Sequence, residues 1–270
     1  MPRKTYAFTL IELLVVISII ALLIGILLPA LGAARNTARD LKCLANQRQM
    51  GIGFHAYASE YDQILPPAFD NQNYNGQATD WSVLITAYLE GNANFTFDDL
   101  EQRNELFSCP QAAVPEGRLH YGTNRNVMPV AFSAAGFGNA PLNKLYNIDW
   151  ESRASDVMWL ADAGQYTLDN GPDLGDSFSA IDFLNQGNGG YRYYSASDTD
   201  NMDAIDEGPN TDGPSQAAAA NLRWRHGTGG KESGSQDNGA VNFLYGDGHA
   251  SSNIWGTVLN ENVRPGAGGS

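Results

Sequence analysis

The sequence predicts an α+β protein in which one long amino-terminal helix packs on an antiparallel β-sheet head with long loops. An apolar run near the start, good helix formers beyond it, and short β-like runs between turns from residue 65 onward all favour this fold class. We expect four segments: a leader at 1–7, an apolar helical half at 8–34, an amphipathic helical half at 35–64 and a globular head at 65–270.

The apolar run from Leu13 to Leu28 carries no charge and follows the basic residues Arg3 and Lys4. The charge-free stretch 13–34 has 22 residues, which is long enough to span roughly 30 Å of hydrocarbon. Pro29 lacks a backbone donor, so it should loosen the helix one turn upstream.

Glu12 is a lone carboxylate at the start of this run, and an ionisable group in hydrocarbon is normally paired or functional. If the chain is cut after Ala7, Phe8 becomes a new amino terminus four residues from Glu12. The ammonium and the carboxylate then lie at the same membrane depth on different copies of the chain. The pattern predicts that this charge pair positions a subunit in a helical filament.

The helix is expected to continue well beyond the membrane. Met50, Phe54, Tyr57 and Tyr61 follow helical spacing and predict an apolar stripe that packs on the head. A helix over 8–59 would be about 75–80 Å long at 1.5 Å per residue.

The head begins where Pro66-Pro67 stops the helix. A polar loop is expected over 70–79 and a short helix over 81–89. Short β-like runs are expected at 106–107, 119–121, 157–160 and 191–194, and the clearest strand at 240–245. Asp247-Gly248 follows that strand and predicts a hairpin turn into 249–252.

The stretch from Ala7 to Ile17 resembles the type IV pilins and the pseudopilins of type II secretion. The resemblance implies that a membrane peptidase cuts between Ala7 and Phe8 and methylates the new amino group. It also implies that Glu12 guides assembly and that Pro29 is the family's helix-loosening proline. Ala7 departs from the family, which usually has Gly before the cut.

The same resemblance implies a function, partners and a location. The chain would be a structural subunit of a pilus-like filament or secretion pseudopilus, built from copies of itself and other pilin-like subunits. Its further partners would be a prepilin peptidase, an inner-membrane assembly platform and, before assembly, membrane lipid. The precursor would cross the cytoplasmic membrane once, with the head in the periplasm or at the cell surface.

Head motifs resemble a bacterial subgroup of pseudopilin-like proteins with a large head: Cys43–Gln49, Phe107–Pro110, Ala161–Ala163, and His226 with Asp247-Gly248. In that subgroup the His and the Asp-Gly usually lie closer together, whereas here 20 residues separate them. An enlarged loop before the final strand is the expected cause.

Two segments carry residue types that can bind metal ions. His226, Asp247 and His249 are one group, with the alternative that Asp247 builds the turn and His226 bonds to a loop backbone. The other is an acidic loop that is either simply solvated or a calcium site, because Ca²⁺ takes six to eight oxygen ligands. Its carboxylates are Asp198, Asp200, Asp203, Asp206 and Glu207.

Cys43 and Cys109 would both lie outside the cytoplasm, where oxidising conditions favour pairing. A bridge would tie the long helix to the head and stabilise the fold by about 3–4 kcal/mol, given its loop of roughly 65 residues. Two buried free thiols are the alternative, and the sequence leaves both open.

Charge and motifs exclude several function classes. Residues 1–50 carry six Lys/Arg and two acidic residues, a net charge of +4. Because the whole chain has a net charge of −14, residues 51–270 carry −18. Nucleic acid is not expected as a partner because basic patches supply that affinity. An enzyme is not expected either: Gly175–Phe178 resembles an esterase nucleophile block, but Asp247-Gly248-His249 lacks the spacing of its partner residues. No cofactor is expected besides the calcium considered above.

Two alternatives to a filament subunit remain open. The amino-terminal segment could be a secretory signal cut near Gly32-Ala33-Ala34, or a simple one-pass anchor. The anchored protein would then bind a ligand or glycan without polymerising. Its site would use aromatic and Asn-rich loops containing Tyr191, Tyr193, Tyr194 and Asn185.

Overall fold

A computed structural model describes much of the 270-residue chain. The described residues are 9–74, 77–91, 105–112, 119–124, 127–128, 130–131, 146–150, 153–166, 176–177, 180–181, 222–227, 239–254 and 257–263. Their helices and 3₁₀ turns are α1 (Leu10–Glu60), α2 (Trp81–Glu90), η2 (Glu105–Phe107), η4 (Ile148–Trp150) and α4 (Asn260–Val263). Their strands are β1 (Phe69–Tyr74), β2 (Gln77–Asp80), β3 (Tyr121–Asn124), β4 (Val130–Ala131), β5 (Met158–Asp162), β6 (Gln165–Tyr166), β7 (Asp176–Ser177), β8 (Ala180–Ile181), β9 (Ala240–Tyr245) and β10 (Ala250–Ile254).

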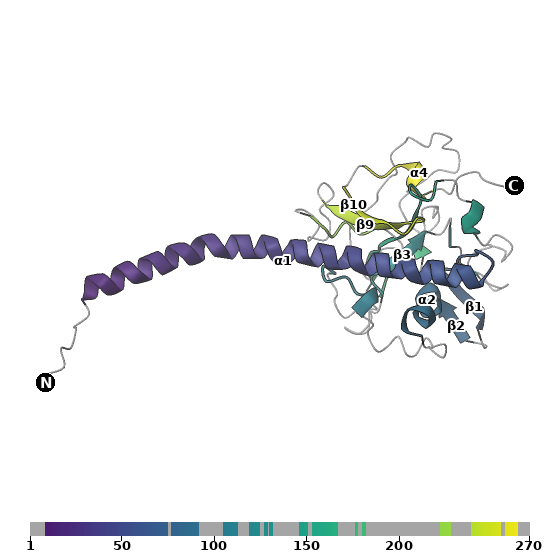
Figure 1. The fold of residues 1–270 in the computed structure, drawn as a ribbon, viewed down its shortest axis with the longest axis horizontal. Coiled ribbons are helices and arrows are strands. Elements are labelled where there is room, and N and C mark those ends of the chain that lie inside the picture. The colour runs from purple at the N-terminus through teal and green to yellow at the C-terminus, as the bar shows by residue number, and fades with distance from the viewer. Residues whose placement is uncertain are drawn as a thin grey trace.

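Helix α1 is one continuous helix of 51 residues, about 75 Å long. It runs through Pro29 without a break, and Figure 1 shows it curving gently along the half that projects from the head. Its second half lies along the head and ends at Glu60, before the two prolines. Asp62 and Gln63, just after the helix, have positive φ angles of 50° and 62° and turn the chain away. The predicted long helix is confirmed.

The main sheet has the strand order β10-β9-β5-β3-β8. The first four strands are antiparallel, and the short β8 pairs parallel with β3. Residues of β3, β5 and β9 are buried along their whole length, because both faces of the sheet are covered. The predicted α+β class with an antiparallel sheet is therefore confirmed.

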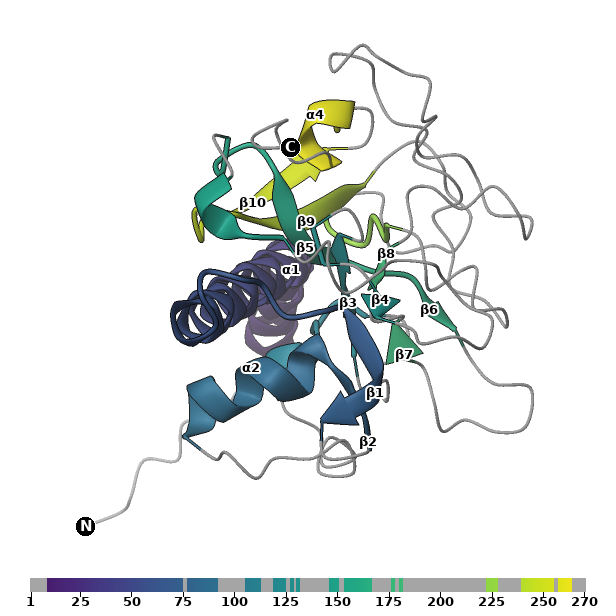
Figure 2. The same cartoon turned by 90° about the vertical axis from the view of Figure 1, so that its right-hand side faces the viewer.

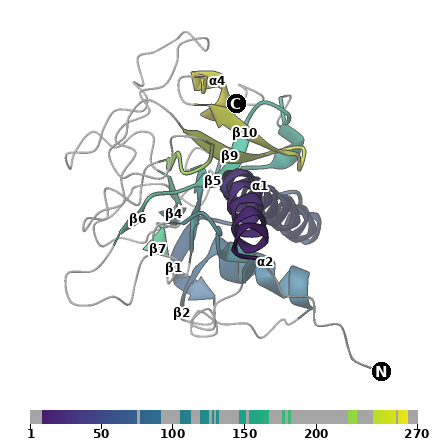
Figure 3. The same ribbon diagram turned by 90° about the vertical axis from the view of Figure 1, so that its left-hand side faces the viewer.

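Side chains on the two faces of β9 belong to two different hydrophobic clusters. Leu244 belongs to the cluster that includes buried residues of α1, whereas its neighbours Phe243 and Tyr245 belong to a second cluster around Trp224. Successive strand residues point to opposite faces, so the sheet is packed on both sides. Figures 2 and 3 show α1 enclosed between this sheet and the layer formed by α2 and β1.

Phe54 of α1 lies inside the cluster that contains the helix. Its ring centroid is 5.5 Å from that of Trp81 on α2 and 6.3 Å from that of Trp159 on β5. Met50 and Phe54 of the predicted stripe are fully buried, whereas Tyr61 is 38% exposed and stacks on Tyr57. The stripe therefore packs on the head over its first half and faces solvent at its end.

Two predictions for the head are wrong. The segment 70–79, predicted as a loop, lies mostly in the antiparallel pair β1–β2, and β1 also pairs parallel with β4. The two-residue Asn75-Gly76 connection between β1 and β2 is a local hairpin signal that the loop prediction missed, and only the pairing of residues 69 and 70 with β4 is long-range. The predicted strand 106–107 is instead part of the 3₁₀ turn η2, whose Leu106 and Phe107 are buried in the core.

Of the remaining predictions for the head, most correspond to observed elements and one lies outside the described residues. The expected strand 119–121 begins only at Tyr121, whereas 157–160 and 240–245 correspond to β5 and β9. The predicted run 191–194 lies outside the described residues. The expected helix 81–89 is α2, which begins after Asp80, whose side chain caps it through the N–H groups of Ser82 and Val83.

Asp247 and Gly248 form the predicted hairpin turn between β9 and β10. The N–H of Gly248 donates to the carbonyl of Tyr245 over 3.0 Å, and the N–H of Tyr245 donates to the carbonyl of His249 over 2.9 Å. Gly248 has φ +85°, a left-handed conformation that favours glycine. The turn fixes the register in which Ala250 pairs with Leu244.

Gly53 lies at the contact between α1 and α2. A Cβ at this position would lie 3.0 Å from the Cβ of Ile85 and 3.1 Å from Leu89. We expect Gly53→Val to lower the free energy of unfolding by about 1–3 kcal/mol, because the added methyl groups overpack this contact. Denaturation of the purified chain in detergent micelles measures the change.

Gly32→Val is the matched control, because it makes the same substitution on the same helix. A Cβ at Gly32 meets nothing within 4 Å, so head stability should stay unchanged. An equal loss in both variants would show that packing against α2 does not cause the effect, since valine has a higher helix propensity than glycine at both positions.

Candidate functional site

The apolar half of α1, hereafter its bare half, is not covered by any other described part of the chain. Every Leu, Ile and Val between residues 10 and 31 is exposed. This is also the one helix among the described residues long and apolar enough to cross a membrane, and none of its most apolar stretch is buried. Packing against the head begins farther along, where Cys43 is the first buried residue of α1.

Thr9 and Glu12 form a capping box at the start of α1. The backbone N–H and the hydroxyl of Thr9 donate to Glu12 Oε2 over 2.9 and 2.7 Å, and the N–H of Glu12 donates back to Thr9 Oγ1 over 3.3 Å. The carboxylate is thereby held at the start of the helix. Ala7 and Phe8 lie outside the described residues.

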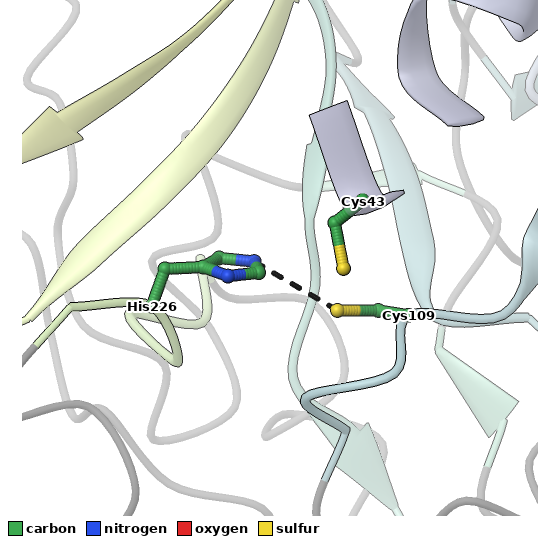
Figure 4. A group of neighbouring side chains, drawn as sticks. All are labelled: Cys43, Cys109 and His226. Atoms are coloured by element: carbon green, nitrogen blue, oxygen red, sulfur yellow. Dashed lines mark hydrogen bonds between the residues drawn. The ribbon is translucent and has the colours of Figure 1, made fainter. Parts of the chain in front are cut away.

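Cys43, Cys109 and His226 converge in the interior of the head, as Figure 4 shows. Each offers one ligand atom, and these atoms all lie within 4.8 Å of one another. Cys109 Sγ is 3.8 Å from His226 Nε2. Both cysteines are free thiols in the structure, and all three residues are buried.

His226 lies between two carboxylates. Its Nδ1 is 2.7 Å from Asp40 Oδ1, and its Nε2 is 3.0 Å from Asp162 Oδ2. A carboxylate only accepts hydrogen bonds, so both ring nitrogens donate and the ring is an imidazolium. Burial alone lowers the pKa of His226, but Asp162 and Asp40 outweigh it and raise the pKa to about 12.

Asp162 is the charged partner at the centre of this cluster. Burial alone raises its pKa, but His226, the guanidinium of Arg225 and the N–H of Asn242 hold the pKa below its usual range. Burial raises the pKa of the Cys109 thiol well above its ordinary value. The cluster therefore combines an imidazolium–carboxylate pair with the neutral thiol of Cys109.

His226 and Asp247, predicted as one signature, have different partners. Asp247 Oδ1 accepts a hydrogen bond from the N–H of His249 over 3.0 Å and contacts its ring nitrogen at 2.5 Å. His249 in turn stacks on Tyr245, with centroids 4.3 Å apart. Asp247 thus builds the turn with its side chain, whereas the His226 ring contacts side chains and not the loop backbone expected from the sequence.

The structure adds Asp40 and Asp162 to the residues that sequence reasoning selected. Asp162 is the central residue of the motif Ala161–Ala163, to which the sequence assigns no function. Asp40 belongs to no motif, and the sequence predicts only that it lies on the long helix. The acidic loop 198–207, considered as a calcium site, lies outside the described residues. So do the aromatic residues 191–194 of the alternative ligand site.

Comparisons with known proteins divide the chain into two matched parts. A family model described as the prokaryotic N-terminal methylation motif matches residues 2–28. A model described as a protein of unknown function, DUF1559, matches residues 32–131. No curated protein and no solved structure matches the chain. The chain therefore matches a prokaryotic N-terminal methylation motif and, directly after it, a DUF1559 model, a combination typical of pilin-like and pseudopilin-like proteins.

Proposed function

We propose that this chain is a structural subunit of a type IV pilus-like filament or a type II secretion pseudopilus. The observation that carries the proposal is the exposed apolar half of α1, most of which lies within the methylation motif and which nothing in the described chain covers. Apolar surface of this extent needs an apolar environment. Lipid supplies it before assembly, and the helices of neighbouring subunits supply it afterwards.

The segments have distinct roles in this proposal. Residues 1–7 are the leader, 8–34 the membrane and assembly half of the helix, 35–64 its amphipathic half, and 65–270 the head outside the cytoplasm. A prepilin peptidase cuts between Ala7 and Phe8 and methylates Phe8. The released ammonium of one subunit then pairs with Glu12 of another on the assembly platform.

Pilin-like proteins are structural proteins, and the proposed work of this one is mechanical. The filament extends, pushes or adheres, and the head presents its acidic surface to the outside. Pro29 lies within the bare half of α1, where loosening of the helix would help neighbouring helices pack.

Mass spectrometry of the native amino terminus tests the processing step. We expect a chain that begins at Phe8 and carries one added methyl group. The matched variant is Ala7→Gly, which restores the residue usual in pilins and should be processed at least as completely as the natural chain.

Other amino termini would contradict the proposal. A chain still starting at Met1 or Pro2 would indicate a static anchor, which is the ligand-binding alternative. A chain starting near Arg35 would indicate a secreted soluble protein.

A further inference from the structure

We propose that Cys43, Cys109 and His226 bind one zinc-type divalent cation in the interior of the head, with Asp162 as the fourth ligand. Two thiolates and an imidazole form a ligand set typical of zinc, and a carboxylate oxygen also binds it. All four residues are buried. The site is independent of filament assembly, because it involves no residue of the bare half of α1.

The distances suit tetrahedral coordination. Ligands about 2.0–2.3 Å from a tetrahedral zinc ion lie roughly 3.3–3.8 Å from one another. Cys109 Sγ is 3.8 Å from His226 Nε2, which is 3.0 Å from Asp162 Oδ2. The thiol of Cys43 lies within 4.8 Å of the other two ligand atoms. Asp162 is not part of this three-residue group, so its carboxylate and the Cys43 thiol would have to move toward the ion to complete the coordination sphere.

Backbone contacts hold the ligand-bearing segments in place. Asn46 of α1 donates to the carbonyls of Glu105 and Ser108, both over 3.1 Å, which fixes the Cys109 segment on the helix. The N–H of Cys109 itself donates to His120 Nδ1 over 2.8 Å. The site is therefore built on the folded core, which favours pre-organised binding.

Asp40 orients the imidazole ring by accepting a hydrogen bond from its Nδ1. Its Oδ1 lies 2.7 Å from His226 Nδ1, on the far side of the ring from Cys109. A carboxylate that accepts from one ring nitrogen directs the other toward the metal and raises its basicity. The backbone of His226 is also fixed, because its N–H and carbonyl both pair with Ala240.

Charge and proton balance are consistent with a divalent ion. Binding replaces three protons, one each from His226 Nε2, Cys43 and Cys109, and these go to solvent. Two thiolates and one carboxylate then face a charge of +2, and the nearby Arg225 offsets the remaining negative charge. Asp162 Oδ1 is a buried oxygen without a hydrogen-bond partner among the described residues. It is therefore available as a ligand for a cation.

The ion would join α1 to three segments of the head. Cys43 lies on α1, Cys109 follows η2, Asp162 ends β5, and His226 precedes β9. A disulfide would join only the two cysteines and leave His226 and Asp162 outside the link. The metal would therefore link the helix to all of these head segments at a single point.

Cobalt titration of the reduced full-length chain in detergent micelles tests this proposal. Co²⁺ reports tetrahedral thiolate coordination through visible ligand-field bands and near-ultraviolet charge-transfer absorption. We expect saturation at one equivalent and loss of these bands when Zn²⁺ displaces Co²⁺. X-ray absorption of the zinc-loaded natural chain should show two sulfur ligands at about 2.3 Å.

Variants assign the ligands. Cys43→Ser and Cys109→Ser should abolish charge-transfer absorption from two thiolates, and Asp40→Asn should keep the spectrum but weaken affinity about 10- to 100-fold. His249→Gln is the matched control, because it removes an exposed histidine outside the cluster. It should bind Co²⁺ as the natural chain does.

Two results would overturn the proposal. One is a reduced natural chain that shows no saturable binding. The other is a zinc-loaded natural chain whose absorption spectrum contains only oxygen and nitrogen ligands. Neither depends on the folding of a variant, and neither bears on whether the chain is processed at Phe8.

Discussion

Replacing Glu12 by alanine is expected to abolish filament assembly while leaving the chain in the membrane. Its carboxylate is the one charge within the exposed apolar half of α1. Without it, the ammonium of an incoming Phe8 would lie unpaired in an apolar environment, which is costly. Electron microscopy and quantification of filaments sheared from cells that carry the complete assembly machinery measure the effect.

The capping box makes further variants necessary, because Glu12 also caps its own helix through Thr9. Glu12→Gln keeps an oxygen that accepts from the N–H of Thr9 but removes the charge. Because the charge is lost, this variant should fail to assemble, as Glu12→Ala does. Glu12→Asp keeps the charge and should retain part of the assembly. Thr9→Ala weakens the cap by about 0.5–2 kcal/mol without changing charge, and should still assemble.

The pattern across these variants decides between charge and capping. Assembly by Glu12→Gln together with failure of Thr9→Ala would show that the helix cap matters and not the charge pair. Normal filaments from Glu12→Ala would remove the basis for a filament role of this residue.

Phe54→Ala is expected to lower the free energy of unfolding of the head by about 3–5 kcal/mol. The ring is fully buried between Trp81 and Trp159, so its removal leaves a cavity where α1, α2 and β5 meet. Guanidinium denaturation of the chain in detergent micelles, followed by tryptophan fluorescence, measures the loss. Trp81 and Trp159 report directly on the site of the change.

Ile52→Ala provides the control for Phe54→Ala. Ile52 lies two residues away on the same helix and is 66% exposed, so its truncation should change stability by roughly 0.5 kcal/mol or less. If both variants lost the same stability, the contact between α1 and the head would not depend on the buried aromatic cluster.

Elements that depend on local pattern were predictable from the sequence. The charge-free run and the helical spacing of Met50 and Phe54 predicted α1, and the β-like run 240–245 followed by Asp247-Gly248 predicted the β9–β10 hairpin. These signals are local, because helix and strand periods and turn chemistry act within a few residues. The prepilin-type motif around Phe8 and Glu12 is local in the same sense.

Elements that depend on distant partners were decided only by the tertiary structure. The β1–β2 pair was predicted as a loop because its local hairpin signal, Asn75-Gly76, was missed, and only its pairing with β4 is long-range. The run predicted as a strand at 106–107 lies in a 3₁₀ turn, whose Glu105 carbonyl accepts from Asn46 of α1. In this second case contacts far along the chain outweighed local propensity.

The buried cluster illustrates the same division at the level of the candidate site. The sequence by itself determined that Cys43 lies on the helix, that Cys109 lies in the head, and that the two could meet. Only the tertiary structure decided that His226, 117 residues beyond Cys109, lies beside them with Asp40 and Asp162. No spacing rule reaches across such separations, because packing of the sheet against α1 sets these distances.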